Sequence, residues 1–230
     1  MRIIVFGANG PTGRLLVGQA LAAGHDVVAV TRRPADFPLR HAQLTVFEGD
    51  VLQPDSVDTA IAGADAVLSA LGVPFGKGEI STYSAGAAHI VAAMRRHEVR
   101  RVAVVSSSAV EPHAYSDGGF LFNRVLQPYV ARVLGRTLYD DMRRMEALIT
   151  ATELDWTVVR PSGLYDLPAV TDYTVVAGHA DHRFTARVDL AAALLRLAEQ
   201  GSFVREVVGV VTTTDNPSMM QLLRQEAFGK

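Results

Sequence analysis

The sequence predicts an α/β protein built on a doubly wound parallel sheet, and three features indicate it. Apolar runs of strand length alternate with segments of helical period over most of the 230 residues. Most of these runs are continuous in Val, Ile, Leu and Ala, as in strands that are covered on both faces. A glycine-rich turn directly follows the first run. Strand–helix–strand repeats imply right-handed crossovers, which place helices on both faces of the sheet.

Two helices stand out between the strands. Apolar side chains recur at helical spacing from Tyr83 over residues 80–97, where cations fill the last turn. A second apolar face covers residues 137–150, with Thr137 as the expected N-cap. The strands expected in the parallel sheet are residues 2–6, 26–31, 44–48, 66–70, 101–106 and 156–160.

After Arg160 the pattern is less regular and predicts a small extension on the substrate side. A helix is expected over about residues 188–199, with strands at 173–176, 183–185 and 206–211. We interpret the chain as one domain of residues 1–230. Its cofactor half is expected over about residues 1–110, and its substrate-side elements over about 109–135 and 161–186.

Composition narrows the function classes. A formal charge of −2 and a pI of about 6.4 supply no basic surface for nucleic acid. The absence of cysteine excludes disulfides, iron–sulfur clusters and thiolate zinc sites. No run reaches the roughly 18 apolar residues of a membrane span, and the N-terminus lacks the pattern of a signal peptide. We expect a soluble, cytoplasmic protein that starts at residue 1 and binds a small molecule, not nucleic acid or a membrane.

The strongest chemical signal is a Gly-x-x-Gly-x-x-Gly turn between the first strand and a helix that runs to about Ala23. In such a turn the first glycine permits a sharp bend, the second admits a pyrophosphate, and the third lets the helix pack close. Phosphates then meet free N–H groups at the helix N-terminus. Thr12 could add a donor and Asn9 could brace the loop, whereas the alternative is a turn without a ligand. The expected site comprises Gly7, Asn9, Gly10, Pro11, Thr12 and Gly13.

The end of the second strand indicates which dinucleotide is preferred. A carboxylate there would bind the ribose hydroxyls and repel a 2′-phosphate. Arg32 and Arg33 stand there instead, and guanidinium groups can grip a phosphate monoester bidentately. We therefore expect NADP, with NADPH preferred over NADH. The alternative is a solvated basic turn.

Small and polar residues end the next three strands, at the carboxyl edge where open α/β sheets bind ligands. Asp50, beside Val51, could accept from the adenine amino group or cap the following helix, although Asp55 is better placed as a cap. Small residues after the fourth strand would let a ribose pass. Serines after the fifth could hold the nicotinamide carboxamide or the substrate, or simply form a turn. These residues are Ala70, Leu71, Gly72, Ser106, Ser107 and Ser108.

Taken together, residues 7–13, 49–52, 86–94, 102–107 and 161–166 resemble the atypical short-chain dehydrogenase/reductase group of NAD(P)H-binding, NmrA-like proteins. Within it the chain is most similar to the flavin reductase/biliverdin-IX-beta reductase type, from residue 2 to about 200. The resemblance implies a Rossmann-like reductase, monomeric or alternatively dimeric, that acts on a flat, electron-poor acceptor. It places Ser107 beside the nicotinamide, and the backbone of Pro161, Ser162 and Gly163 against its carboxamide.

The chain departs from the usual dehydrogenase proton donor, a Tyr followed four residues on by a Lys that lowers the phenol pKa. Tyr139 is followed instead by Arg143, which cannot relay a proton but could stabilise a phenolate. Ser107, Tyr139 and Arg143 are the candidate catalytic residues, and a plain helix surface is the alternative for the last two. The tetrapyrrole reductases of the family also carry a His close to the position of Gly163.

The acceptor is expected to lie on the irregular segment 109–135 and on residues 164–165. Aromatic side chains there could stack on a flat ring system, and Arg124 could meet an anionic tail. Ordinary packing is the alternative for each residue. The candidates are His113, Tyr115, Phe120, Phe122, Arg124, Tyr129, Leu164 and Tyr165.

Two functions remain open from the sequence. The first is an NADPH-dependent reductase of flavins, quinones or biliverdin-like acceptors, with FMN or FAD as substrate and the proton supplied mainly by solvent. The second is an NmrA-like sensor that binds the dinucleotide without chemistry. No metal is expected, because His179, Asp181 and His182 have no evident fourth ligand. The glycine turn lacks the Lys of an NTPase loop, and Ser107 lacks a hydrolase elbow.

Overall fold

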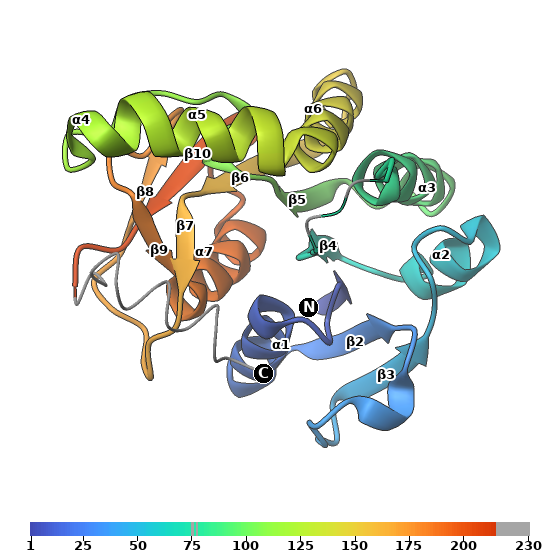
Figure 1. Cartoon of the computed structure of the whole chain (residues 1–230). Helices are drawn as coiled ribbons and strands as arrows, with labels where there is room; N and C mark the ends of the chain where they lie inside the picture. Colours follow the sequence, from blue (N-terminus) through green and yellow to red (C-terminus); the bar gives the residue numbers. More distant parts are fainter. Residues whose placement is uncertain (75, 77, 215–230) are drawn as a thin grey trace.

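A computed structural model describes residues 1–74, 76 and 78–214 (Figure 1). Its centre is an eight-stranded sheet in the order β3-β2-β1-β4-β5-β6-β10-β8, and β7 pairs with β9 in a separate two-stranded sheet. The β8–β10 pairing is antiparallel and the other pairings of the large sheet are parallel. The strands are β1 (Arg2–Phe6), β2 (Asp26–Thr31), β3 (Leu44–Glu48), β4 (Ala66–Ser69), β5 (Arg101–Val105), β6 (Asp155–Pro161), β7 (Gly163–Tyr165), β8 (Thr174–Ala177), β9 (Phe184–Ala186) and β10 (Glu206–Val211).

Helices cover both faces of this sheet (Figure 1). One layer consists of α1 (Pro11–Ala22) and α7 (Arg187–Gln200), whose Leu16 and Leu194 are fully buried. The other consists of α2 (Pro54–Ile61), α3 (Thr82–Arg96) and α6 (Arg136–Thr150), which bury Ile90 and Met145 in a second core. The predicted doubly wound α/β architecture is therefore confirmed.

Helix starts differ from the sequence expectation in two places. Thr137 does not cap α6, because the helix begins at Arg136 after Gly135, and the Thr137 hydroxyl donates to the Gly76 carbonyl at 3.3 Å. Neither Asp50 nor Asp55 caps α2. Its N-cap is Gln53, without a side-chain hydrogen bond.

The segment expected to be irregular between residues 109 and 135 is helical from Gly119 onward. α4 (Gly119–Leu121) and α5 (Gln127–Tyr129) join two π-helical stretches, Phe122–Leu126 and Val130–Leu134, into one continuous helix. Pro128 lies in its interior. Proline lacks an N–H and crowds the preceding turn, so widened turns are a way to carry it without a break. Within the described residues, no helix has the length and apolar character needed to cross a bilayer.

Candidate functional site

The candidate site lies at the carboxyl ends of β1 and β4, where the strand order reverses. Two positions of the turn after β1 have no room for a side chain. Gly7 has a φ of +74°, and a Cβ on it would lie 2.4 Å from the Ala70 carbonyl oxygen. A Cβ on Gly13 would lie 2.2 Å from the Gly7 carbonyl oxygen. The glycines thus bring the start of α1 against the ends of both strands.

The N-terminus of α1 is open to a ligand. Gly10 is the N-cap and supplies no side chain, and Pro11 follows at the first helical position. The amides of Thr12 and Gly13 belong to the first helical turn, where no intrahelical carbonyl can accept from them. The loop is braced as expected, because the Asn9 side-chain oxygen accepts from Arg14 Nε at 3.0 Å and from Nη2 at 2.8 Å. This cradle fits the diphosphate of a dinucleotide.

The residues expected to meet the adenosine half follow β2 and β3. Arg32 and Arg33 are exposed beyond the end of β2, and Arg33 Nε lies 3.6 Å from Asp36 Oδ2. Asp50 Oδ1 accepts from the Leu52 amide at 3.0 Å, which fixes the turn after β3.

Two further contacts set the neighbouring loops. The Val51 side chain packs against Gly86 of α3, where a Cβ would lie 2.7 Å from Val51 Cγ2. Leu71 and Gly72 continue from Ala70 after β4, and a Cβ on Gly72 would meet nothing within 4 Å. The chain is then held by the Val73 amide, which donates to the Tyr83 hydroxyl at 3.1 Å.

Hydroxyl groups gather at the carboxyl ends of β5 and β6. The Tyr139 hydroxyl of α6 is hydrogen-bonded to the Ser107 side chain, and the Tyr115 hydroxyl donates to Ser108 Oγ at 2.7 Å. Ser162 Oγ donates to the Tyr115 hydroxyl at 3.4 Å. We call Ser107, Ser108, Tyr115, Tyr139 and Ser162 the hydroxyl cluster.

Ser106 lies beside this cluster and is 3% exposed. Within the described part of the chain, its Oγ has no hydrogen-bond partner. Buried hydroxyls nearly always find one, so Ser106 Oγ is a candidate contact for a ligand group.

Arg143 donates hydrogen bonds to groups other than Tyr139. Burial raises the pKa of Tyr139, and the hydrogen bond with Ser107 offsets part of that increase. Arg143 Nε donates to the Val110 carbonyl at 2.9 Å and Nη1 to Asp140 Oδ1 at 2.6 Å. Its charge is thereby held by Asp140. The structure brings Ser107 to Tyr139, and a catalytic role of Arg143 stays a prediction.

The backbone after β6 has its donors already engaged. Pro161 has no N–H, the Ser162 amide donates to Thr185 Oγ1 at 3.1 Å, and the Gly163 amide donates to the Arg183 carbonyl at 2.8 Å. A carboxamide held by this backbone would therefore have to donate to its carbonyl oxygens.

Of the residues expected to meet the acceptor, some lie next to the hydroxyl cluster and others lie elsewhere. The ring centroids of His113 and Tyr115 lie 4.6 Å apart next to the hydroxyl cluster. Tyr165 is 2% exposed and its hydroxyl donates to the Thr214 carbonyl at 2.8 Å, so it supports the fold. Leu164 packs at the edge of the α1/α7 core. Arg124 is exposed on the helix 119–134.

Two charged residues near the acceptor side were missed by sequence reasoning. Arg183 Nε lies 3.2 Å from Asp117 Oδ2, and the Arg183 guanidinium lies over the rings of Phe122 and Phe184, at 5.4 and 5.1 Å from their centroids. No local pattern marks this pair, because the partners are far apart in sequence and meet only through the tertiary fold.

Comparisons with known proteins agree with this geometry. A crystal structure of a wide-type short-chain dehydrogenase/reductase from Veillonella parvula in complex with NADP superposes with a TM-score of 0.77 at 21% identity, covering 95% of this chain and 99% of that one. The anaerobillin reductase ChuY of Escherichia coli O157:H7 superposes with a TM-score of 0.71 at 22% identity, covering 95% and 100%. These similarities show the Rossmann-like fold.

Among curated proteins, the chain is 38% identical over 72 residues to the photosystem II assembly factor Ycf39 of Synechocystis, which is 30% of this chain and 22% of that protein. The chain thus spans only about a fifth of the length of this relative. The model of the NAD(P)H-binding family matches residues 7–201. On that match and the glycine turn, the chain belongs to the NAD(P)H-binding family, with an oxidoreductase-like fold.

Proposed function

We propose that the protein is an NADPH-dependent reductase of a flat, conjugated acceptor such as a flavin, a quinone or a biliverdin-like molecule. The observation that carries this proposal is the hydroxyl cluster, in which Tyr139 is hydrogen-bonded to Ser107 at the carboxyl edge of the sheet. The NADP complex of the Veillonella protein and the reductase activity named for ChuY support the cofactor and the class of reaction.

Different residues of this chain would bind the cofactor and contact the acceptor. The glycine turn and the first turn of α1 would hold the diphosphate, and Arg32 would hold the 2′-phosphate. NADPH, when bound, supplies the hydride. The Tyr139 phenol, whose pKa burial raises further above neutrality, is protonated at neutral pH and can donate a hydrogen bond to the acceptor, with Ser107 orienting it. The proton that completes the reduction comes mainly from solvent.

The experiment is NADPH oxidation followed by absorbance, with FMN, an uncharged quinone and biliverdin offered in turn. We expect turnover with at least one acceptor. Tyr139→Phe should lower kcat with little change in KM for NADPH, because the ring remains and the hydroxyl is lost.

A second function is favoured by the partners of Arg143, which donates to Asp140 and to the Val110 carbonyl. We propose as the alternative a redox sensor that binds NADP(H) without chemistry. Tight NADPH binding by calorimetry, together with no turnover across the acceptor panel, would overturn the reductase and favour the sensor.

A further inference from the structure

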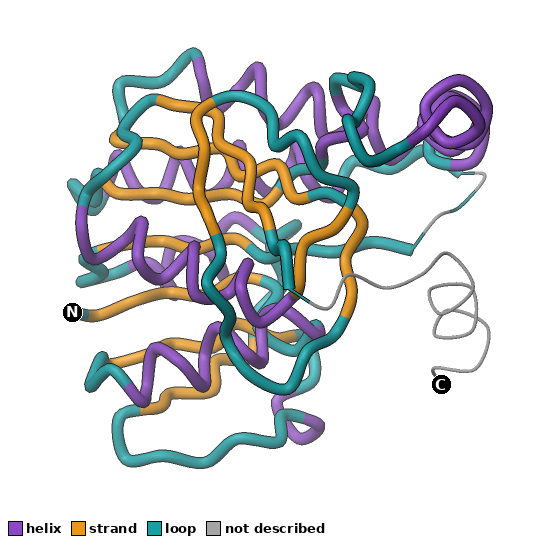
Figure 2. The backbone as a smooth tube through the Cα atoms, turned by 90° about the vertical axis from the view of Figure 1, so that its left-hand side faces the viewer, coloured by secondary structure: helices purple, strands orange, loops and turns teal. Residues whose placement is uncertain are grey.

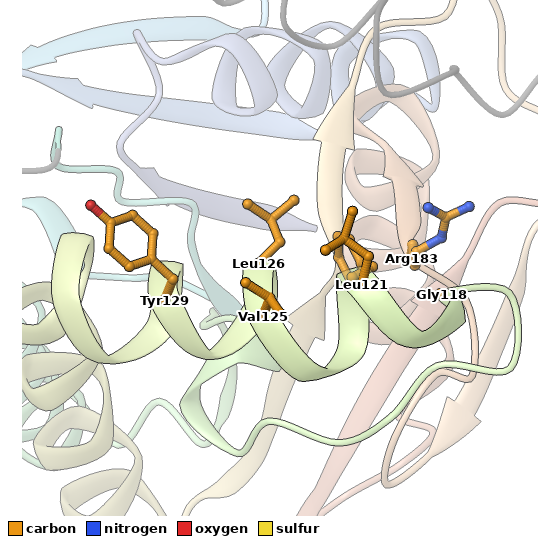
Figure 3. A pocket seen from close by; sticks show the side chains of 7 residues that line it. Gly118, Leu121, Val125, Leu126, Tyr129 and Arg183 are labelled. Carbon is orange, nitrogen blue, oxygen red and sulfur yellow. The ribbon is translucent and has the colours of Figure 1, made fainter.

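An apolar groove of about 390 Å³ lies beside the hydroxyl cluster. Phe122 of its lining connects it to the cluster, because the Phe122 ring centroid lies 6.0 Å from that of Tyr115. Leu121, Leu126 and Tyr129 project from one side of the helix into the groove, with Arg183 near the Gly118 end (Figure 3). The lining consists of Gly118, Leu121, Phe122, Val125, Leu126, Tyr129 and Arg183.

The helix over residues 119–134 turns its larger apolar side chains away from the protein. A row at four-residue spacing is 70%, 52%, 51% and 61% exposed, and consists of Leu121, Val125, Tyr129 and Val133. The opposite row is small or polar, and consists of Asn123, Gln127, Ala131 and Gly135. In Figure 2 this helix is seen end-on at the upper right, beside the strands.

This orientation is held by specific contacts. Gln127 and Ala131 are buried. Asn123 binds the backbone of Tyr115 twice, accepting from its amide at 3.0 Å and donating to its carbonyl at 2.9 Å. Amphipathic helices normally bury their apolar face, and contiguous apolar surface left in water marks a binding site. We therefore expect the groove side of this helix to bind a ligand.

The groove carries little net charge although it contains a guanidinium group. Asp117 faces Arg183 with Oδ2 at 3.2 Å from Nε, and both side chains are mostly buried. The Arg183 backbone amide also lies 3.5 Å from Asp117 Oδ2, so the carboxylate is held just before β9. Arg124, the cation expected to meet an anionic tail, is not part of the lining. An anionic ligand at Arg183 would also meet the repulsion of the Asp117 carboxylate.

We propose that this groove binds the acceptor, that the acceptor is an uncharged ring with apolar substituents, and that Asp117 sets this preference by neutralising Arg183. The redox part rests on the proposed function, whereas the binding preference does not require turnover. For a quinone the step balances as NADPH, a proton and quinone giving NADP⁺ and hydroquinone. The nicotinamide C4–H bond breaks, its hydride carries both electrons to the quinone, and solvent supplies the proton.

Calorimetric titration of the NADP⁺-loaded protein tests this preference. The probes are menadione, which is uncharged, and 1,4-naphthoquinone-2-sulfonate, which presents the same ring system with an anion. We expect the wild-type protein to bind menadione more tightly. Asp117→Asn keeps an oxygen acceptor for the Arg183 amide and removes the charge, so the affinity ratio of sulfonate to menadione should rise by about tenfold.

A second pair of variants locates the site. Leu126→Ser should weaken menadione binding several-fold. Val204→Ser should not, because Val204 lies outside the groove although its exposure is similar (39%, against 36% for Leu126). Circular dichroism confirms that each variant is folded. The proposal is overturned if the wild-type protein binds neither probe or binds the sulfonate more tightly. It is also overturned if Asp117→Asn does not raise the affinity ratio, or if the two Ser variants have equal effects. If menadione binds as expected but NADPH is not oxidised, the proposed reductase function is wrong and the assignment of the groove as a binding site is kept.

Discussion

Gly13 occupies the tightest point of the nucleotide turn. Because a Cβ there would lie 2.2 Å from the Gly7 carbonyl oxygen and 2.8 Å from Ala8 Cα, Gly13→Ala must displace the backbone that receives the diphosphate. We expect NADPH affinity to fall by tenfold or more, with a loss of about 1–3 kcal/mol in the free energy of unfolding. Calorimetry and urea unfolding measure the two effects.

Gly18 provides the matched control on the same helix. A Cβ on it would meet nothing within 4 Å, so Gly18→Ala should stabilise the protein by about 0.5–1 kcal/mol through helix propensity and leave NADPH affinity unchanged. Equal losses of affinity in both variants would show that the turn has no special role.

Arg32 is expected to decide between the two nicotinamide dinucleotides. Arg33 is the weaker candidate, because its guanidinium lies 3.6 Å from the Asp36 carboxylate. Arg32→Ala should weaken NADPH binding by about tenfold through loss of a charge-assisted phosphate contact, with little effect on NADH. Titration of both cofactors against wild type and variant measures this, and equal weakening would refute the phosphate assignment.

Local residue patterns were enough to predict the glycine turn, because its geometry follows from the sterics of consecutive residues. The same reasoning found Ser107 and Tyr139 separately, but the hydrogen bond between them depends on how α6 lies against the end of β5. Arg183 and Asp117 could not be found in this way. Their chemistry arises only after the chain segments that carry them are brought together.

At the scale of elements, α3 is capped by another helix. Its N-cap Ser81 makes no side-chain hydrogen bond to the helix. Instead Asp141 of α6, which is fully buried, accepts from the Tyr83 amide at 2.8 Å, from the Ser84 hydroxyl and from Arg144 Nη2 at 3.1 Å. A carboxylate at a helix N-terminus also interacts favourably with the helix dipole. One side chain thus fixes α6 to the start of α3.

Asp141→Ala should therefore destabilise the protein far more than its neighbour Asp140→Ala. The first change leaves buried donors of α3 without an acceptor, which costs about 2–4 kcal/mol. Asp140 forms surface ion pairs with Arg136 and Arg143, so its removal should cost less than about 1 kcal/mol. Urea unfolding compares the two, and similar losses would contradict the capping role.

The helix over residues 119–134 could not be predicted from its sequence pattern. Hydrophobic periodicity predicts a helix when the apolar face points at the core, and α3 and α6 were found because their apolar residues do so. Here the apolar row faces outward and Pro128 interrupts the expected pattern. The outward-facing apolar row thus explains both why this helix was predicted to be irregular and why it lines the proposed acceptor groove.

At the scale of the whole molecule, the parallel core could be predicted because right-handed crossovers leave few alternatives for alternating strands and helices. The C-terminal third could not be placed in the same way. β8 runs antiparallel beside β10, and β7 pairs with β9 outside the large sheet. These pairings join short strands separated by loops, so tertiary contacts, not local pattern, decide their partners.

We expect acid stability to depend on ion pairs that join segments distant in sequence. Asp58 of α2 accepts from Arg96 Nε at 2.7 Å and lies 3.2 Å from His97 Nε2, both at the end of α3. Asp155 of β6 accepts from Arg100 Nε at 3.1 Å. The hydrogen bond from the arginine is the main cause that lowers the pKa of each carboxyl below the usual value of 3.8.

The sign of the pH effect follows from these lowered pKa values. Between the folded and the unfolded pKa the unfolded chain binds more protons, so the stabilisation is complete above about pH 5 and is lost as the pH falls through the folded pKa. The urea midpoint of the wild-type protein should therefore drop as the pH is lowered from 5 to about 3. In Asp58→Asn/Asp155→Asn the midpoint should already be lower at pH 7 and should decline less steeply. Asp26→Asn, at an exposed position on β2, is the control. A slope flattened as much by Asp26→Asn would show that general charge, not these two contacts between elements, governs acid stability.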